Sequence, residues 1–279
     1  MIERLLKLSI SIVFYTVYRG IILIYLLLKK PFPATIAVLM YHSLKSEQRS
    51  RFEKHMDELI KAGRPVRANI LGPLMKGQHH IAVTFDDGYQ SVLNNALPIL
   101  IARKIPATIF VTTGYLGAKP GWIHNPDHEN INENILTEEQ LKQIPDDLIT
   151  IGSHSVTHPH LASIGKDDAF KELIESKKTL EDMLHTDITL LSLPYGSINK
   201  EIIDMAKRAG YKHIYLNIPS LPFSKVGEYV IGRINISLDD WLIEYHLKLL
   251  GAYQWLFFAI IFKRKLINLV RLMVRRKLR

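Results

Sequence analysis

The stretch Ile81-Ala82-Val83-Thr84-Phe85-Asp86-Asp87-Gly88 decides the fold class of this chain. Its first five residues are apolar or β-branched, which is typical of a buried strand, and two carboxylates follow where that strand ends. In a parallel α/β protein, ligands bind beyond the carboxyl ends of the strands, because the loops there can vary while the sheet stays rigid. Gly88 then allows a tight backbone turn beside the two acids.

A second strand ends in the same way further along the chain. Residues 148–151 read as a strand, Gly152 ends it, and His154 and His158 follow in the stretch HSVTHP. Two imidazoles and a carboxylate form a mixed nitrogen and oxygen set suited to zinc or a neighbouring transition metal. Alone, the two acids would be interpreted as part of a turn, and the two histidines as a surface or core pair. Both motifs at strand ends indicate a metal site, and its open coordination positions favour a catalytic one.

These motifs resemble those of the NodB-type polysaccharide deacetylases. Residues 84–88 are similar to the first motif of that family, residues 154–159 to the second, and residues 105–111 to the strand between them. The resemblance implies one divalent metal ion, with zinc first and cobalt, nickel or iron as alternatives. It also implies a general base, Asp86, and three metal ligands, which are Asp87, His154 and His158.

A third motif is similar to Leu193-Pro194-Tyr195-Gly196. By resemblance, the backbone N–H of Tyr195 helps to bind the oxyanion, and residues Pro194, Tyr195 and Gly196 contact the substrate. The commoner pattern has an arginine a few residues earlier, but residues 190–193 read Leu-Leu-Ser-Leu. Arg233 is a candidate to approach the site instead, although an ordinary surface arginine is an equally good reading.

The general acid is predicted at the other end of the chain. The family's usual C-terminal Leu-x-His is not visible after residue 200, whereas residues 36–42 form a strand-like run that ends in His42. This resembles the permuted branch of the family, which includes poly-N-acetylglucosamine deacetylases. We therefore expect His42 to be the acid, and the alternative is that His42 only caps a strand.

The implied reaction is hydrolysis of the N-acetyl amide of an amino sugar. Asp86 takes a proton from water, and His42 protonates the leaving amine, which otherwise would be a very poor leaving group. Two alternatives stay open: a deformylase that acts on a lipid-linked amino sugar, and a catalytically silent, membrane-bound glycan-binding protein.

The remaining pattern predicts an α/β fold, a distorted (β/α) barrel in a domain at residues 34–237. Residues 117–136 are rich in Gly, Pro, Asn and His and read as a loop that could form a lip over the substrate. Strands are expected at 35–40, 81–85, 107–111, 148–151, 189–193, 213–216 and 230–236, and helices at 51–62, 91–103, 137–143, 166–185 and 199–209.

Both ends of the chain suggest contact with membrane lipids. Residues 1–30 form an apolar segment, and Arg19 within residues 5–28 leaves open whether it spans the bilayer or lies in the interface. Residues 238–279 are predicted to form basic amphipathic helices, starting from a capping box at residues 237–240. The net charge of +9 is concentrated there. The aliphatic residues among those charges favour anionic lipid over nucleic acid as the partner.

These ends predict a protein associated with the bacterial inner membrane. The lysine and arginine density favours the cytoplasmic face over the periplasmic one. The substrate would then be an N-acetylated amino sugar held at the membrane, such as a cell-envelope glycan or a lipopolysaccharide precursor. The chain has no cysteine, which excludes disulfides and thiolate ligands.

Overall fold

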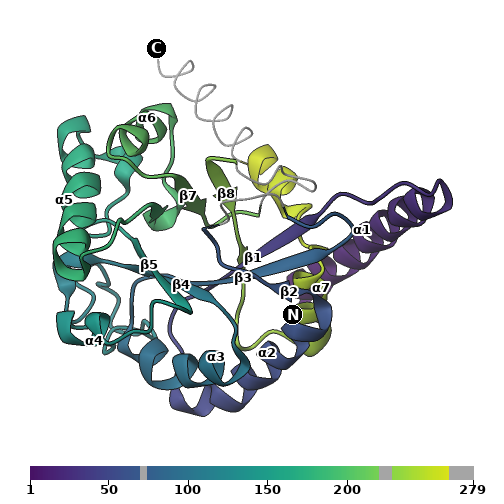
Figure 1. Cartoon of the computed structure of the whole chain (residues 1–279), viewed down its shortest axis with the longest axis horizontal. Helices are drawn as coiled ribbons and strands as arrows, with labels where there is room; N and C mark the ends of the chain where they lie inside the picture. Colours follow the sequence, from purple (N-terminus) through teal and green to yellow (C-terminus); the bar gives the residue numbers. More distant parts are fainter. Residues whose placement is uncertain (70–73, 220–227, 264–279) are drawn as a thin grey trace.

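The computed structural model describes residues 1–69, 74–219 and 228–263. It confirms the predicted fold class, because parallel strands form a sheet that curls into a nearly closed barrel with helices on its outside (Figure 1). The strands run in the order β8-β7-β6-β5-β4-β3-β1-β9, and β2 pairs with β3. The strands are β1 (Thr35–Tyr41), β2 (Arg64–Pro65), β3 (His79–Phe85), β4 (Ala107–Val111), β5 (Ile149–Ser153), β6 (Leu190–Ser192), β7 (His213–Leu216), β8 (Val230–Gly232) and β9 (Ile234–Asn235).

The barrel closes at a seam between β8 and β9. The sequence pattern predicts one strand over 230–236, and this is wrong, because β8 pairs with β7 whereas β9 pairs with β1. Arg233 lies in the break, and its backbone N–H bonds to the carbonyl of Ile218 (2.8 Å). The Arg233 side chain is fully buried. Two residues adjacent in sequence to Arg233 thus belong to opposite ends of the sheet.

The helices agree with the predicted ranges to within a few residues, with one exception. Pro98 at the start of α3 lacks an N–H, and a π-helical turn over Val92–Ala96 precedes it where the pattern predicts regular helix. The carbonyl of Asn94 accepts a hydrogen bond from Arg49 instead (3.2 Å). The helices are α1 (Ile2–Leu27), α2 (Arg49–Ala62), α3 (Leu97–Arg103), α4 (Glu138–Lys142), α5 (Lys166–Leu184), α6 (Lys200–Arg208) and α7 (Leu242–Leu249).

The expected helix start at residues 237–240 is wrong. These residues form a turn, in which the N–H of Asp240 bonds to the carbonyl of Ser237 (3.1 Å). The Asp240 carboxylate accepts from the Ser237 N–H (3.0 Å) and from the Lys248 ammonium (2.6 Å). Helix α7 starts at Leu242, and the side chain of Glu244 accepts from the backbone N–H of Trp241, its N-cap.

The N-terminal segment forms the 26-residue helix α1. By length and composition it could cross a membrane, with a mean hydropathy of 1.9 in its most apolar window, of which 6% is buried. A signal sequence would meet the same criterion. Of the predicted C-terminal amphipathic helices, the part over 264–279 lies outside the described residues.

His55, a buried histidine on α2, predicts how stability depends on pH. His55 stacks on Tyr245 with ring centroids 3.7 Å apart, and burial lowers its pKa to about 4. Because the unfolded chain binds a proton more readily than the folded one, stability is complete above pH ~6.5 and falls as the pH drops towards 4. We expect His55→Phe to remove on the order of 3 kcal/mol of this acid-dependent loss. Urea unfolding at several pH values measures it; an unchanged pH slope in the variant would contradict this assignment.

Candidate metal centre and active site

The strand ends bring the two predicted motifs together. Asp86 and Asp87 follow β3, and His154 follows β5. The two strands are separated by β4 alone, so their carboxyl ends lie at one edge of the sheet. A side chain at Gly88 would have its Cβ 3.2 Å from Val111, and the residue has a φ of +79°, so the turn requires glycine.

The site concentrates unusual backbone conformations. Asp87, Ser155, His158 and Tyr195 all have positive φ, between 58° and 71°, although none is glycine. Such conformations cost of the order of 1 kcal/mol or more each and persist where the surroundings hold them. Hydrogen bonds do so here, because Ser155 Oγ accepts from the N–H of His158 (3.1 Å), and Glu172 on α5 accepts from the N–H groups of residues 156 and 157 (both 2.8 Å).

Three of the predicted residues form a compact ligand set. The Nε2 atoms of His154 and His158 each lie 3.4 Å from Oδ1 of Asp87. One ligand atom from each residue falls within 4.8 Å of the others, and all three side chains are buried. The second ring nitrogen of His154, Nδ1, bonds to the carbonyl of Ser192 (2.8 Å), which directs Nε2 at Asp87.

The chemistry of this set fits a metal ion. Among the described residues, Oδ1 of Asp87 is buried without a hydrogen-bond partner, which is costly for a carboxylate unless another group compensates it. A cation held by one carboxylate and two imidazoles supplies that compensation. Burial raises the pKa of Asp87, but its contacts with His154 and His158 outweigh burial and hold the pKa well below its ordinary value. The carboxylate is therefore available as a ligand.

Asp86 is held in a different way, by a buried arginine. Arg233 binds it with both ends of the guanidinium, Nη1 to Oδ1 at 2.6 Å and Nη2 to Oδ2 at 2.7 Å. Ser192 Oγ also donates to Oδ2 (3.1 Å) and accepts from Nη2 of Arg233 (2.7 Å). Burial raises the pKa of Asp86, but the charge of Arg233 and then that of His154 outweigh it, so the pKa is lowered. Asp86 thus stays ionised, next to Asp87 of the candidate ligand set.

Of the other predicted residues, His42 and Tyr195 line the same cavity, which has a volume of about 720 Å³. His42 follows β1, and Tyr195 lies in the turn after β6. Pro194 and Gly196 are buried in that turn, whereas Tyr195 is 44% exposed. The loop predicted as a lip, 117–136, contributes a wall that includes Trp122 and His124, and Asp239 lies in the segment after β9 that forms another.

Comparison with known proteins places the chain in a family. The model of the family described as polysaccharide deacetylase matches residues 75–214. This chain belongs to the polysaccharide deacetylase family. The Bacillus subtilis family member YxkH is 31% identical over 216 residues, which cover 74% of this chain and 72% of YxkH.

Further relatives agree with this deacetylase assignment. A poly-β-1,6-N-acetyl-D-glucosamine N-deacetylase of Staphylococcus aureus is 28% identical over 56% of this chain and 54% of its own length. Among solved structures, IcaB from Ammonifex degensii has a TM-score of 0.64 at 22% identity, covering 80% of this chain and 99% of IcaB. The Streptococcus pyogenes deacetylase PplD, in complex with acetate, has a TM-score of 0.59 at 23% identity, covering 75% and 95% of the two chains. These structures share the barrel fold.

The structure adds two residues to the predicted site, Ser192 and Trp122. The first, Ser192, ends β6 two residues before Pro194, and that position is a usable signal in the sequence. The second, Trp122, lies in the predicted loop 117–136, where no local pattern marks it. Its ring stacks on His158 with a centroid distance of 4.5 Å and an interplanar angle of 23°. Tyr195 packs edge-on against the same His158 ring (4.7 Å) and stacks on His160 (3.9 Å).

Trp122 is expected to position the metal ligand His158. In the described part of the chain, Nδ1 of His158 is buried without a hydrogen bond, whereas a ligating histidine usually donates that N–H to an acceptor. Stacking on Trp122 is the contact that would fix the orientation of this ring. We expect Trp122→Ala to weaken zinc binding about 10-fold or more, the scale found for outer-shell partners, and Trp122→Phe to restore most of it. Competition with a chromophoric chelator measures the affinity; unchanged affinity in Trp122→Ala would leave Trp122 a substrate contact only.

Proposed function

We propose that the protein is a metal-dependent hydrolase that removes the N-acetyl group from an amino sugar. One observation carries this proposal: a carboxylate clamped by Arg233 lies beside the Asp87, His154 and His158 set, in the cavity that His42 also lines. A ligand set, a base and an acid on one cavity are the parts that amide hydrolysis requires.

Each residue then has a separate task. Asp87, His154 and His158 would hold the metal, which when bound supplies Lewis acidity toward water and the amide carbonyl. Asp86 accepts the proton from water, because Arg233 keeps it ionised and fixes both its oxygens. The N–H groups of Gly196 and Ser197 bond to carbonyls within their own turn, so the backbone N–H of Tyr195 is the one proposed to bind the oxyanion.

His42 is proposed to protonate the leaving amine. We expect His42→Asn to lower kcat on an N-acetyl sugar by about 10²- to 10⁴-fold, the range for a general acid, with metal content unchanged. A phenyl ester with a nitro-substituted leaving group needs no proton, so its hydrolysis should survive the substitution. Equal losses on amide and ester would indicate that His42 positions substrate or only caps β1.

The substrate class follows from the relatives and from α1. One matched relative is named for deacetylation of poly-β-1,6-N-acetyl-D-glucosamine, which makes an N-acetylglucosamine-type sugar the first candidate. The exposed apolar helix α1 favours a sugar held at the inner membrane over a soluble polymer. The Lys and Arg residues over 263–279 favour the cytoplasmic face, which protease protection in spheroplasts would test.

The direct test is product analysis. The purified chain, loaded with zinc, is incubated with N-acetylglucosamine oligomers and with lipid-linked N-acetyl sugars, and mass spectrometry follows the loss of an acetyl group. Acetate release that stops on chelation and returns with added metal supports the proposal. Formate release from N-formyl sugars, with no acetate from N-acetyl sugars, would favour the deformylase alternative. No acyl release from any of them would overturn hydrolysis.

A further inference from the structure

Helix α1 has its polar and apolar faces reversed compared with a helix that packs on a protein in water. Such a helix turns its apolar stripe inward and its polar side chains outward. On α1 the buried and half-buried positions recur every three or four residues, and most end in a polar group. These inward positions are Arg4, Lys7, Leu8, Ser11, Phe14, Tyr15, Tyr18, Ile22 and Tyr25.

The outward face of α1 is aliphatic along its whole length. Its large side chains are between 37% and 85% exposed. The two hydroxyl residues at exposed positions bond back to the helix itself: Ser9 Oγ to the Leu5 carbonyl (3.0 Å) and Thr16 Oγ1 to the Ile12 carbonyl (2.9 Å). This is how a hydroxyl is satisfied where no water is available. The aliphatic side chains include Leu5, Leu6, Ile12, Val13, Val17, Leu23, Ile24 and Leu27.

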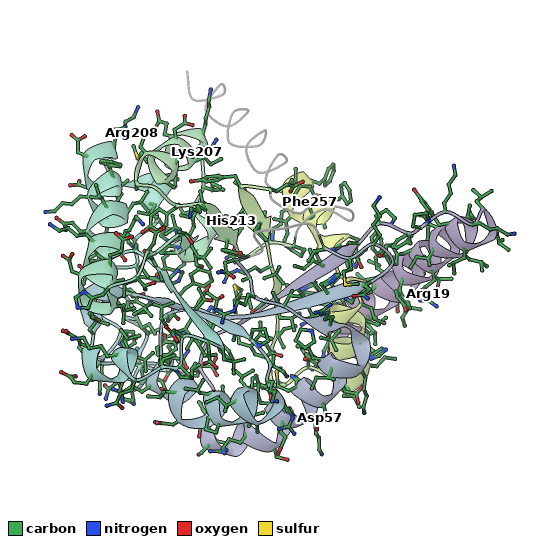
Figure 2. The ribbon with its side chains drawn as sticks, viewed as in Figure 1. Arg19, Asp57, Lys207, Arg208, His213 and Phe257 are labelled. Atoms are coloured by element: carbon green, nitrogen blue, oxygen red, sulfur yellow. The ribbon has the colours of Figure 1, made fainter. Side chains whose placement is uncertain are left out.

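Charges lie at the flanks of this face. Glu3 pairs with Lys7 at an inward position (2.6 Å). Arg19 directly follows the inward residue Tyr18 and lies on the half of α1 that stands clear of the barrel (Figure 2). A guanidinium at the flank can reach lipid headgroups while its stem lies along the apolar face.

The first half of α1 is fixed to the catalytic body. Arg4 pairs with Glu244 on α7 (2.5 Å) and lies over the Trp241 ring (4.4 Å). The indole N–H of Trp255 donates to Ser11 Oγ (2.9 Å), and Leu8 and Tyr15 pack against an apolar cluster formed with Leu247 and Tyr253. This half of the helix is therefore held against the folded domain, where the charged pair of Arg4 and Glu244 disfavours its entry into hydrocarbon.

The length that remains is too short to cross a bilayer. From Thr16 to Leu27 the helix extends about 18 Å at 1.5 Å per residue, against a hydrocarbon core of about 30 Å. We therefore infer that α1 lies in the plane of the membrane interface, with its aliphatic face in a bilayer that contains anionic phospholipid and its polar-tipped face on the catalytic domain. The inference deepens the proposed function, and it rests on that function only for the substrate.

This arrangement places the active-site cavity next to the membrane surface. The guanidinium of Arg4 donates to the backbone carbonyl of Asp239 (2.8 Å), and Asp239 lines the cavity. The N-terminal end of α1 thus lies at the rim of the cavity. A sugar carried on a lipid would reach the cavity without leaving the headgroup region, so α1 selects membrane-held substrates by position.

Depth measurements test the orientation without any turnover. The chain has no cysteine, so single nitroxide labels can be attached at Leu6→Cys, Val13→Cys and Ile24→Cys in the full-length protein. Ile174→Cys on α5, an exposed apolar residue of the barrel, is the matched control. The protein is bound to vesicles of phosphatidylethanolamine and phosphatidylglycerol, and accessibility to oxygen and to a nickel chelate gives the depth of each label.

We expect the three α1 labels to lie at one shallow depth, about 5–10 Å into the headgroup and acyl boundary, and the α5 label to stay in water. A depth that rises to a maximum along the helix would show a span and overturn the inference. Labels that are shielded without vesicles and broadened by one another would show a second copy of the chain on this face, which also overturns it. The double variant Val13→Asp/Val17→Asp should lose vesicle binding, whereas Ile174→Asp should retain it.

Discussion

Asp86→Asn is expected to lower kcat by about 10²- to 10⁴-fold while the protein still binds one metal ion per chain. The amide keeps the volume of the carboxylate but cannot accept a proton at neutral pH, so the base is lost and the ligand set is not. Asp87→Asn should lose the metal and turnover with it, because it removes the carboxylate whose Oδ1 faces both histidine Nε2 atoms at 3.4 Å. Metal content by mass spectrometry and kcat on an N-acetyl sugar separate the two.

The pair of variants makes the role assignment falsifiable. Asp86→Asn leaves Arg233 buried without its charge partner, so both proteins are assayed well below their melting temperatures. Retained turnover in Asp86→Asn would sink the assignment of the base. Loss of metal from Asp86→Asn and not from Asp87→Asn would exchange the two roles.

Arg233→Met is expected to lower the free energy of unfolding by about 3–5 kcal/mol, since removing one partner leaves a buried charge unpaired. Asp86 would keep only Ser192 as a hydrogen-bond donor among the contacts described here. The double variant Asp86→Asn/Arg233→Met should recover part of that loss, because it removes the orphaned charge. Arg103→Met is the matched control: its partners Asp57 and Glu53 are surface carboxylates, so it should cost about 1 kcal/mol or less.

In Arg233→Met, the contribution of Asp86 to stability should change with pH in the opposite direction to its contribution in the parent protein. In the parent, the pKa of Asp86 is lowered, so its contribution to stability is present above the ordinary carboxyl pKa of about 4 and is lost as pH falls below it. Without Arg233, burial raises that pKa, and the variant should lose stability as pH rises. Urea midpoints across that range, compared with Arg103→Met, measure the difference. Parallel pH curves would mean that Arg233 does not control Asp86.

The sequence predicts those parts of the site that short, contiguous patterns identify. Asp87 follows a strand whose apolar run is visible, and His154 follows another, so parallel strand geometry alone brings them together. Arg233 and Asp86 are 147 residues apart, and no local pattern indicates that their side chains meet. The predicted strand 230–236 fails for the same reason, since its division depends on which strands each half pairs with.

Local patterns also mislead where a tertiary contact competes with them. The residues at 237–240 are typical of a helix start, and the Asp240 carboxylate accepts from the Ser237 N–H, but it is also bound to Lys248 and the helix begins only at Leu242. For α1, periodicity identifies an apolar helix but not the side that faces the protein. Its inward stripe is defined by contacts with Glu244 and Trp255, which lie at the far end of the chain.

The seam at Arg233 has a consequence for biosynthesis. The segment that matches the family model, 75–214, contains Asp86 and the candidate ligands Asp87, His154 and His158, but lacks both Arg233 and His42. As the chain leaves the ribosome, the ligand loops emerge well before β8 and β9, so the barrel cannot close and Asp86 has no charge partner. We expect the nascent chain to remain inert until Arg233 has emerged, so activity in the cell reports completed chains and not partly made ones.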